Sequence, residues 1–360
     1  MTGNEPTSAW RKLLHNKGAV IGIVIIVIAL LTALLAYWLA PDSTPDANRM
    51  MVEIGGRKPG FTQQFFLLPK EPAVAKVNWL DRTLHGQPDM HLFIPVSTYE
   101  IKDGQVILQK YIDDGITEPV TYSLAGWQQP VEQLFVSKTF LLGTDKYGRD
   151  ILSRLIIGVR VSLLVGGIAM LLSLSIGLLL GALAGYYGGR WDNWIMWFIN
   201  VIWSIPTLLL VFAITLLLGK GFWQVFIAVG LTMWVNVARI VRGQLLAIRH
   251  LEYVEAARVL GYKDLRIIVK HILPNIIGPV LVVAAANFAS AIVVEAGLSF
   301  LGVGVQPPQP SWGGMIKENY NFIITNNPML ALAPGFAIMF LVLAFNLLGN
   351  GIRDALDVRN

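Results

Sequence analysis

The sequence predicts an all-α membrane protein with six transmembrane helices and a small extracytoplasmic insertion of mixed or β-containing structure. Of the 360 residues, 54% are hydrophobic and only 14% are charged, which is unusual for soluble domains of this length. Apolar segments long enough to cross a bilayer recur along the chain. A single polar stretch of about 100 residues interrupts them.

The first span is predicted at residues 18–40. No charged side chain occurs between Gly18 and Ala40, and a helix of this length rises roughly 34 Å, enough to cross the hydrocarbon core. The stretch is too long for a signal-peptide core, so we expect a retained anchor. Residues 1–17 would form a cytoplasmic N-terminus.

Residues 41–141 form the predicted insertion. Scattered charges, Pro and Gly replace the apolar runs there, and alternating runs at 105–108 and 120–123 are typical of strands. The chain has no cysteine, so this part is expected to fold without disulfides.

The remaining spans are predicted within a core at residues 142–350, at 159–186, 193–218, 222–240, 276–298 and 328–350. Thirteen basic residues then fall on one side of the membrane, whereas the short connections on the other side hold only Lys220 and Lys317. The positive-inside rule therefore places both termini in the cytoplasm, including residues 351–360. The same rule accounts for the net charge of +5, so nucleic acid is not an expected partner.

Small and helix-breaking residues stand inside two spans. Gly177, Gly181 and Gly185 repeat every fourth residue on one helical face, which predicts close helix packing. Pro206 predicts a kink in the span at 193–218, and kinked helices sometimes line a path.

Three features of the spans are candidates for a translocation path or gate: Pro206, Asn287 and Glu295. An intramembrane carboxylate is costly unless it is paired or hydrated. Replacement of Glu295 by Gln is therefore expected to lower transport without disturbing assembly, although a place at the outer interface is an alternative. The Gly- and Pro-rich stretch 302–314 predicts an irregular loop, either re-entrant or capping a pore mouth.

A further helix is expected just before the second span. Thr144 and Asp145 would cap an amphipathic helix that runs through Gly158. Arg149 and Arg154 would then lie along the outer membrane interface. Substrate contact is the alternative role for this segment.

The loop at residues 241–275 carries the clearest functional pattern. Tyr253, Ala256, Ala257 and Leu260 share one face of a short helix that stops at Gly261. Pro274 is expected to mark the turn into the next span. By periodicity alone, a docking helix and a helix resting on the lipid interface are equally compatible with this pattern.

Sequence motifs favour docking. The string from Glu255 to Gly261, followed by His271-Ile-Leu-Pro-Asn275, resembles the EAA loop of ABC importer permeases. Segments 142–154, 298–313 and 346–357 are similar to "C"-type permeases of the dipeptide, oligopeptide and nickel family. The resemblance covers residues 141–360 closely, residues 1–40 loosely, and not the insertion.

This resemblance implies the type I ABC importer permease fold and a set of partners. They are a homologous "B"-type permease forming a heterodimer, two ATPase subunits, and an extracytoplasmic peptide-binding protein, all at a bacterial cytoplasmic (inner) membrane. ATP and Mg would be held by the ATPases, with no cofactor on this chain. The loop would be the ATPase-coupling element, through Tyr253, Glu255, Ala256, Ala257, Leu260, Gly261, His271 and Pro274.

No enzyme motif competes with this interpretation. A phosphate-binding loop is missing, because Gly219-Lys220 is followed by Gly. The five histidines show no metal-ligand spacing. Alternatives are an ion-driven secondary transporter, import of nickel or another peptide-like solute, and an anchored binding module centred on the insertion. The insertion itself could dock the binding protein, contact the second permease or fill an outer vestibule.

Overall fold

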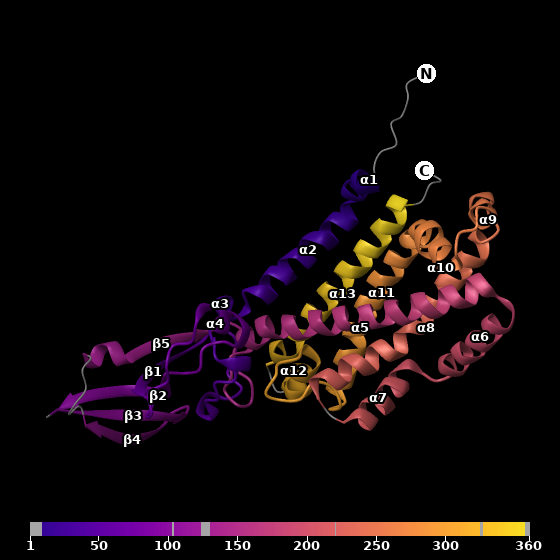
Figure 1. Cartoon of the computed structure of the whole chain (residues 1–360). Helices are drawn as coiled ribbons and strands as arrows, with labels where there is room; N and C mark the ends of the chain where they lie inside the picture. Colours follow the sequence, from indigo (N-terminus) through magenta and orange to yellow (C-terminus); the bar gives the residue numbers. More distant parts are fainter. Residues whose placement is uncertain (1–8, 103, 124–129, 220, 325–326, 357–360) are drawn as a thin grey trace. The chain divides into compact units, whose positions relative to one another are not determined.

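The computed structural model describes residues 9–102, 104–123, 130–219, 221–324 and 327–356 (Figure 1). The chain divides into two compact units, each assembled from distant segments. We call them the helical unit, residues 1–30, 162–306 and 338–360, and the sheet unit, residues 31–161 and 307–337.

Long apolar helices correspond to all six predicted spans. Within the described residues, five helices are long and apolar enough to cross a membrane: α2 (Lys17–Leu34), α5 (Ile151–Tyr187), α8 (Phe222–Ile248), the segment Asp264–Phe300, and α13 (Met329–Leu356). The sixth is a broken pair, α6 (Gly189–Trp203) and α7 (Thr207–Leu218), bent by 91°. The bend falls at Pro206, where a kink is predicted, and Ser204 Oγ donates a hydrogen bond to the carbonyl of Val201 at 2.7 Å.

Several helices are longer than the apolar runs that predict them. α5 begins at Ile151 rather than at 159, and α8 continues to Ile248 rather than to 240. The predicted turn at Pro274 is wrong, because α10 (Asp264–Ile267), a π-helical turn (Ile268–Ile272) and α11 (Leu273–Phe300) follow without a break. Proline in the first turn of α11 loses a hydrogen bond that the wider π turn already interrupts.

Glycine allows α2 and α13 of the helical unit to approach closely. A methyl group at Gly22 of α2 would lie 2.6 Å from the carbonyl oxygen of Ala344 in α13, so these helices run side by side (Figure 1). α8 is the centre of the unit and packs against α7 and α11. Short α1 (Ala9–His15) precedes α2.

The sheet unit confirms the strands predicted in the insertion. Five antiparallel strands pair in the order β4-β3-β2-β1-β5: β1 (Phe61–Pro69), β2 (His91–Lys102), β3 (Gln105–Asp113), β4 (Ile116–Ser123) and β5 (Phe135–Phe140). Alternate side chains point to opposite faces of a strand. Phe66 and Leu108 accordingly join one apolar cluster, whereas Phe65 and Phe140 join another.

The insertion does not fold apart from its flanking residues. Helix α4 (Trp79–His85) packs on α3 (Ala36–Leu39), where Trp38 Nε1 donates to Thr83 Oγ1 at 2.9 Å. Arg160 of α5 donates to the carbonyl of Leu84 at 2.9 Å. The compact unit is therefore wider than the predicted 41–141.

The segment before α5 differs from its prediction. Thr144 and Asp145 do not cap the helix; Asp150 does, since its Oδ2 accepts a hydrogen bond from the Ser153 amide at 2.9 Å. Asp145 instead closes the preceding turn, accepting hydrogen bonds from the amides of Tyr147 and Arg149.

Arg149 and Arg154 do not lie along an outer interface, as predicted, because they are 1% and 2% exposed. Arg149 donates to Asp145 and to Glu318 of α12 (Trp312–Asn319), both at 2.6 Å. The carboxylates of Asp145 and Glu318 offset the cost of burying the guanidinium groups, so Arg149 and Arg154 lie in the interior.

The predicted irregular loop at 302–314 is shorter than expected. α11 ends at Phe300 and α12 already begins at Trp312. The hydroxyl of Ser311 accepts a hydrogen bond from the Gly314 amide at 3.1 Å and caps α12, so Gly313 and Gly314 are helical.

Candidate functional site

α9 (Glu252–Val259) has a buried side and an exposed side. Val254 and Ala257 are buried in an apolar cluster with residues of α5, α8, α10 and α11, among them Tyr186, Val241, Leu245, Ile267 and Ile276. Tyr253, Ala256 and Leu260 are exposed. The predicted shared face is thus split between the two sides of the helix. Burial of Val254 removes more apolar surface from water than burial of Ala256 would. Ala257 lies on the same side as Val254 and is therefore buried as well.

Large apolar side chains stand exposed around the end of α9. Val259, Leu260 and Leu265 are 87%, 71% and 72% exposed. With the partly exposed Tyr253, we call these four residues the α9 patch. They are neighbours along the chain, and apolar side chains exposed in this way are candidates for an interaction surface.

Charged side chains surround the α9 patch. Glu252 and Glu255 are exposed in the first turn, and Arg258 is exposed beside Val259. A helix that rests on an anionic bilayer has a basic polar face. Exposed Lys263 and Arg266 stand beside Leu265 in the same way, so charges of both signs surround the patch.

Aromatic contacts hold the loop after α9 in one conformation. The rings of Tyr262 and His271 stack at 5.7 Å, and the Arg266 guanidinium lies 4.4 Å above the Tyr262 ring. The hydroxyl of Tyr186 in α5 donates to Asp264 at 2.7 Å. His271 therefore stabilises the loop after α9 through its contact with Tyr262.

Gly261 ends α9 as predicted, with a φ of +76°. A methyl group there would meet no atom within 4 Å, so the backbone conformation, not space, requires glycine. Tyr253 is held from behind, since Asn275 Nδ2 donates to its hydroxyl at 3.2 Å.

A second feature lies at the break between α6 and α7. A cavity of about 220 Å³ opens there. Its walls include Trp203, Thr207, Thr232, Asn236 and Ser290; we call it the helix-break pocket. Asn236 of α8 and Ser290 of α11 are exposed although both lie in helices long and apolar enough to cross a membrane.

Two contacts fix α6 against α8 beside this pocket. Arg242 donates through Nη2 to Asp192 Oδ2 at 2.7 Å and through Nε to Oδ1. The Arg239 guanidinium lies 3.8 Å above the ring of Trp203, a favourable cation–π distance.

The three predicted path residues do not meet at this pocket. Pro206 lies at the break itself. Asn287 is buried and donates to Ser173 Oγ at 3.2 Å and to the carbonyl of Met233 at 3.3 Å. Glu295 is 0% exposed and accepts a hydrogen bond from Ser299 Oγ at 2.6 Å. The structure thus places Asn287 and Glu295 in the protein interior.

The three predicted packing glycines all face α8. Added methyl groups would lie 2.4 Å from Val237 Cβ at Gly177 and 2.6 Å from Leu245 Cβ at Gly185. At Gly181 the nearest atom would be the carbonyl oxygen of Ala238, at 2.6 Å. Such distances exclude any side chain without a shift of α8.

Sequence reasoning missed Asn236, Ser290, Val259 and Leu265. An amide or hydroxyl within an apolar run is costly in lipid, but no motif or spacing separates Asn236 and Ser290 from the other neutral polar residues of the spans. Val259 and Leu265 fall outside the helical periodicity of α9, so only the loop geometry shows that they are exposed.

Comparisons with known proteins identify the family of the chain. A family profile described as "Binding-protein-dependent transport system inner membrane component" matches residues 177–360. A second, "N-terminal TM domain of oligopeptide transport permease C", matches residues 7–54.

Three relatives illustrate the similarity. The oligopeptide transport system permease protein OppC of Haemophilus influenzae is 39% identical over 67% of this chain and 78% of its own length. A glutathione transport system permease, GsiD of Pectobacterium atrosepticum, is 42% identical over 61% and 73%. The dipeptide transport system permease protein DppC of Bacillus subtilis is 43% identical over 60% and 67%.

Proposed function

Because the chain belongs to the family of binding-protein-dependent transport system inner membrane components, we propose that it forms half of the pore of an ATP-driven peptide importer. It is a multi-pass membrane permease with the fold of ABC importer permeases, and the peptide-permease resemblance in its sequence is confirmed. The names of its relatives point to oligopeptides, dipeptides and glutathione as substrates.

The α9 patch carries the proposal. Leu260 and Val259 are more than two-thirds exposed, at 71% and 87%, whereas Val254 and Ala257 of the same helix are buried. A helix that is buried on one side and ends in exposed apolar side chains suits a rigid contact that transmits force. We assign this patch to the ATPase.

Force applied to α9 would reach several spans at once. Val254 and Ala257 share one buried cluster with Val241 and Leu245 of α8 and with Ile272 beside α11. Packed interiors move as rigid bodies because they are close-packed. Closure of the ATPases would therefore tilt α5, α8 and α11 together, opening and closing the path.

The energy source lies on the partners in this proposal. The chain has no phosphate-binding loop, so ATP and Mg are assigned to two ATPase subunits. Both chain ends and α9 then face the cytoplasm, in accordance with the basic residues of the inner loops. A "B"-type permease would complete the pore, and a binding protein would deliver the peptide from outside.

The helix-break pocket is assigned to the path. Polar side chains in a membrane span face protein or water rather than lipid. Asn236, Ser290 and Thr207 line this pocket, and all three are neutral. Hydroxyl and amide groups can hydrogen-bond a peptide backbone whatever its side chains, which suits a transporter of varied peptides.

The test is peptide uptake by the complete transporter in proteoliposomes, with Gly261→Asp compared with Gly261→Asn. Both residues tolerate a positive φ, so only the charge differs. Asp should uncouple uptake from ATP hydrolysis by placing a carboxylate beside the α9 patch, and Asn should retain most uptake. Normal uptake with Asp, or uptake that follows an ion gradient without ATP, would reject the proposal.

A further inference from the structure

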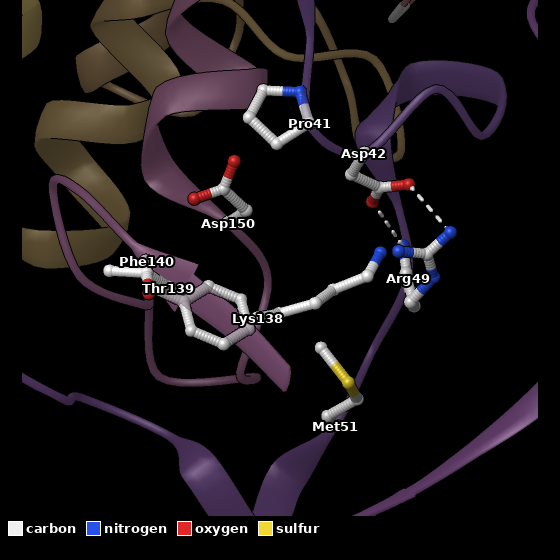
Figure 2. A pocket seen from close by; sticks show the side chains of 8 residues that line it. All are labelled: Pro41, Asp42, Arg49, Met51, Lys138, Thr139, Phe140 and Asp150. Carbon is white, nitrogen blue, oxygen red and sulfur yellow. Dashed lines mark hydrogen bonds and ion pairs between the residues drawn. The ribbon is translucent and has the colours of Figure 1, made fainter. Parts of the chain in front are cut away.

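The sheet unit contains a small pocket whose lining is rich in charge (Figure 2). Its volume is about 200 Å³, and it is lined by Pro41, Asp42, Arg49, Met51, Lys138, Thr139, Phe140 and Asp150. Pockets for drug-sized ligands are larger, about 300–1,000 Å³. A ligand here would be no larger than one or two amino-acid residues.

Arg49 is fully engaged within this pocket. Its guanidinium donates to both carboxylate oxygens of Asp89, with 2.7 Å between Nε and Oδ2. It also pairs with Asp42 at 3.4 Å and lies 4.0 Å above the ring of Phe93. Arg49 is thus paired with two carboxylates, those of Asp89 and Asp42.

Lys138 has no such partner. Its ammonium lies 4.5 Å from the centre of the same Phe93 ring, and no described carboxylate lies within ion-pair distance of it. Burial, together with the charge of Arg49, lowers the pKa of Lys138 to about 8. The side chain therefore remains mostly protonated at neutral pH, and its ammonium group is available to bind an anionic group of a ligand.

Asp150 provides the opposite charge. Its Oδ2 accepts hydrogen bonds from the amide and hydroxyl of Ser153. Figure 2 shows Lys138 extended toward Asp42 and Arg49, with Asp150 apart from that group. Met51, Phe140 and Pro41 supply the apolar part of the wall.

We propose that this pocket binds a small zwitterion, with its carboxylate on Lys138, its ammonium on Asp150 and an apolar side chain against Met51 and Phe140. α-Amino acids and very short peptides have this chemistry. The proposal concerns residues of the sheet unit alone, so it does not depend on the proposed transport function.

The charges of the pocket favour a zwitterion over a simple anion. Two cations, Arg49 and Lys138, face three carboxylates, Asp42, Asp89 and Asp150. A bound anion would increase the existing excess of negative charge. A bound cation would be repelled by the ammonium of Lys138. A ligand that carries both charges adds no net charge, and it offers an opposite charge to both Lys138 and Asp150.

The first experiment measures equilibrium binding to the complete transporter in nanodiscs, without ATP. Four probes share an apolar side chain: leucine, dileucine, 4-methylpentanoate without the ammonium, and 3-methylbutylamine without the carboxylate. Leucine or dileucine should bind at least tenfold more tightly than either truncated compound, since each loses a charge-assisted hydrogen bond. The tighter of the two identifies free amino acids or peptide ends as the source.

The second experiment uses matched variants. Lys138→Met keeps the apolar stem and should weaken binding about 10- to 100-fold. Lys146→Met is the control, because Lys146 is an exposed lysine that also lies over an aromatic ring, that of Tyr147, at 4.8 Å. Asp150→Asn preserves the helix cap and should weaken binding while leaving thermal unfolding nearly unchanged.

Several results would overturn the proposal. They are no binding of leucine or dileucine at millimolar concentration, equal binding of 4-methylpentanoate, or wild-type affinity in Lys138→Met. The last result would place the bound probe elsewhere, for example in the helix-break pocket.

Discussion

The α9 patch and the helix-break pocket are opposite in character, although both belong to the helical unit. At α9, which lies between two membrane-spanning helices, apolar residues such as Leu260 are exposed. At the helix break, within the spans, the exposed residues include the polar Asn236 and Ser290. Each surface suits neither water nor lipid at its position. Such a mismatch indicates that another protein or a solute normally covers it.

The two surfaces also differ in how they are supported. The underside of α9 packs into an apolar cluster through Val254 and Ala257. The broken pair is held by the ion pair between Arg242 and Asp192 and by Arg239 on Trp203. A packed support suits a surface that transmits force. Polar contacts at a bend can rearrange with less loss of packing.

The largest expected effect is on the α9 patch. Leu260→Glu should reduce peptide uptake more than tenfold, because burying an unpaired carboxylate at an interface costs several kcal/mol. The ATPase should co-purify less with this variant. Ile116→Glu, at an exposed apolar position of β4 that is 58% exposed, is the control and should transport normally. Equal loss in both variants would remove the distinction between the patch and any other exposed apolar residue.

Asn236→Leu tests the other surface. Loss of one hydrogen bond to a passing peptide, worth about 1 kcal/mol, should lower uptake roughly fivefold. ATPase co-purification should be unchanged, unlike in Leu260→Glu, and Asn236→Gln should restore part of the uptake. If Asn236→Leu instead released the ATPase, the two surfaces would not be functionally separate.

The glycines of α5 are linked to both surfaces, because they set the distance between α5 and α8, and α8 contributes to both. Gly181→Ala should lower the melting temperature of the complex, because the new methyl group would lie 2.6 Å from the Ala238 carbonyl oxygen and overpacking costs about 1–3 kcal/mol. Gly243→Ala in α8 is the control. A methyl group there meets nothing within 4 Å, and alanine favours a helix by about 1 kcal/mol.

A melting temperature that falls equally in both variants would show that the loss of stability does not come from the contact between Gly181 and α8. Uptake should fall only modestly in Gly181→Ala, because the change acts on stability rather than on either functional surface.

Periodicity and glycine chemistry made the helices predictable. Apolar length predicted a long apolar helix, or in one case a bent pair of helices, for each expected span. Gly261 ended α9 because a positive φ selects for glycine. The α9 interior was less predictable, since Val254 and Ala256 compete for burial and the neighbouring helices decide the outcome. The sequence of α9 alone does not predict which helices pack against it.

Charged residues were the least predictable. Arg149 resembles an interfacial residue in sequence, yet it donates to Glu318, which is far away along the chain. The same applies to Arg49 and Asp89 in the sheet unit. A buried charge depends on a distant partner, so its place follows from the fold rather than from the surrounding residues.

Glu295→Gln should have the smallest effect and decides whether the polar path extends beyond the helix-break pocket. If the Glu295 side chain faced the path, the neutral variant would lower transport with assembly intact. The structure buries it and pairs it with Ser299, whose Oγ also accepts a hydrogen bond from the Val305 amide at 3.1 Å. Glutamine can still accept from Ser299, so uptake should stay within about twofold of wild type. A larger loss of uptake at unchanged melting temperature would extend the path to α11 near Glu295.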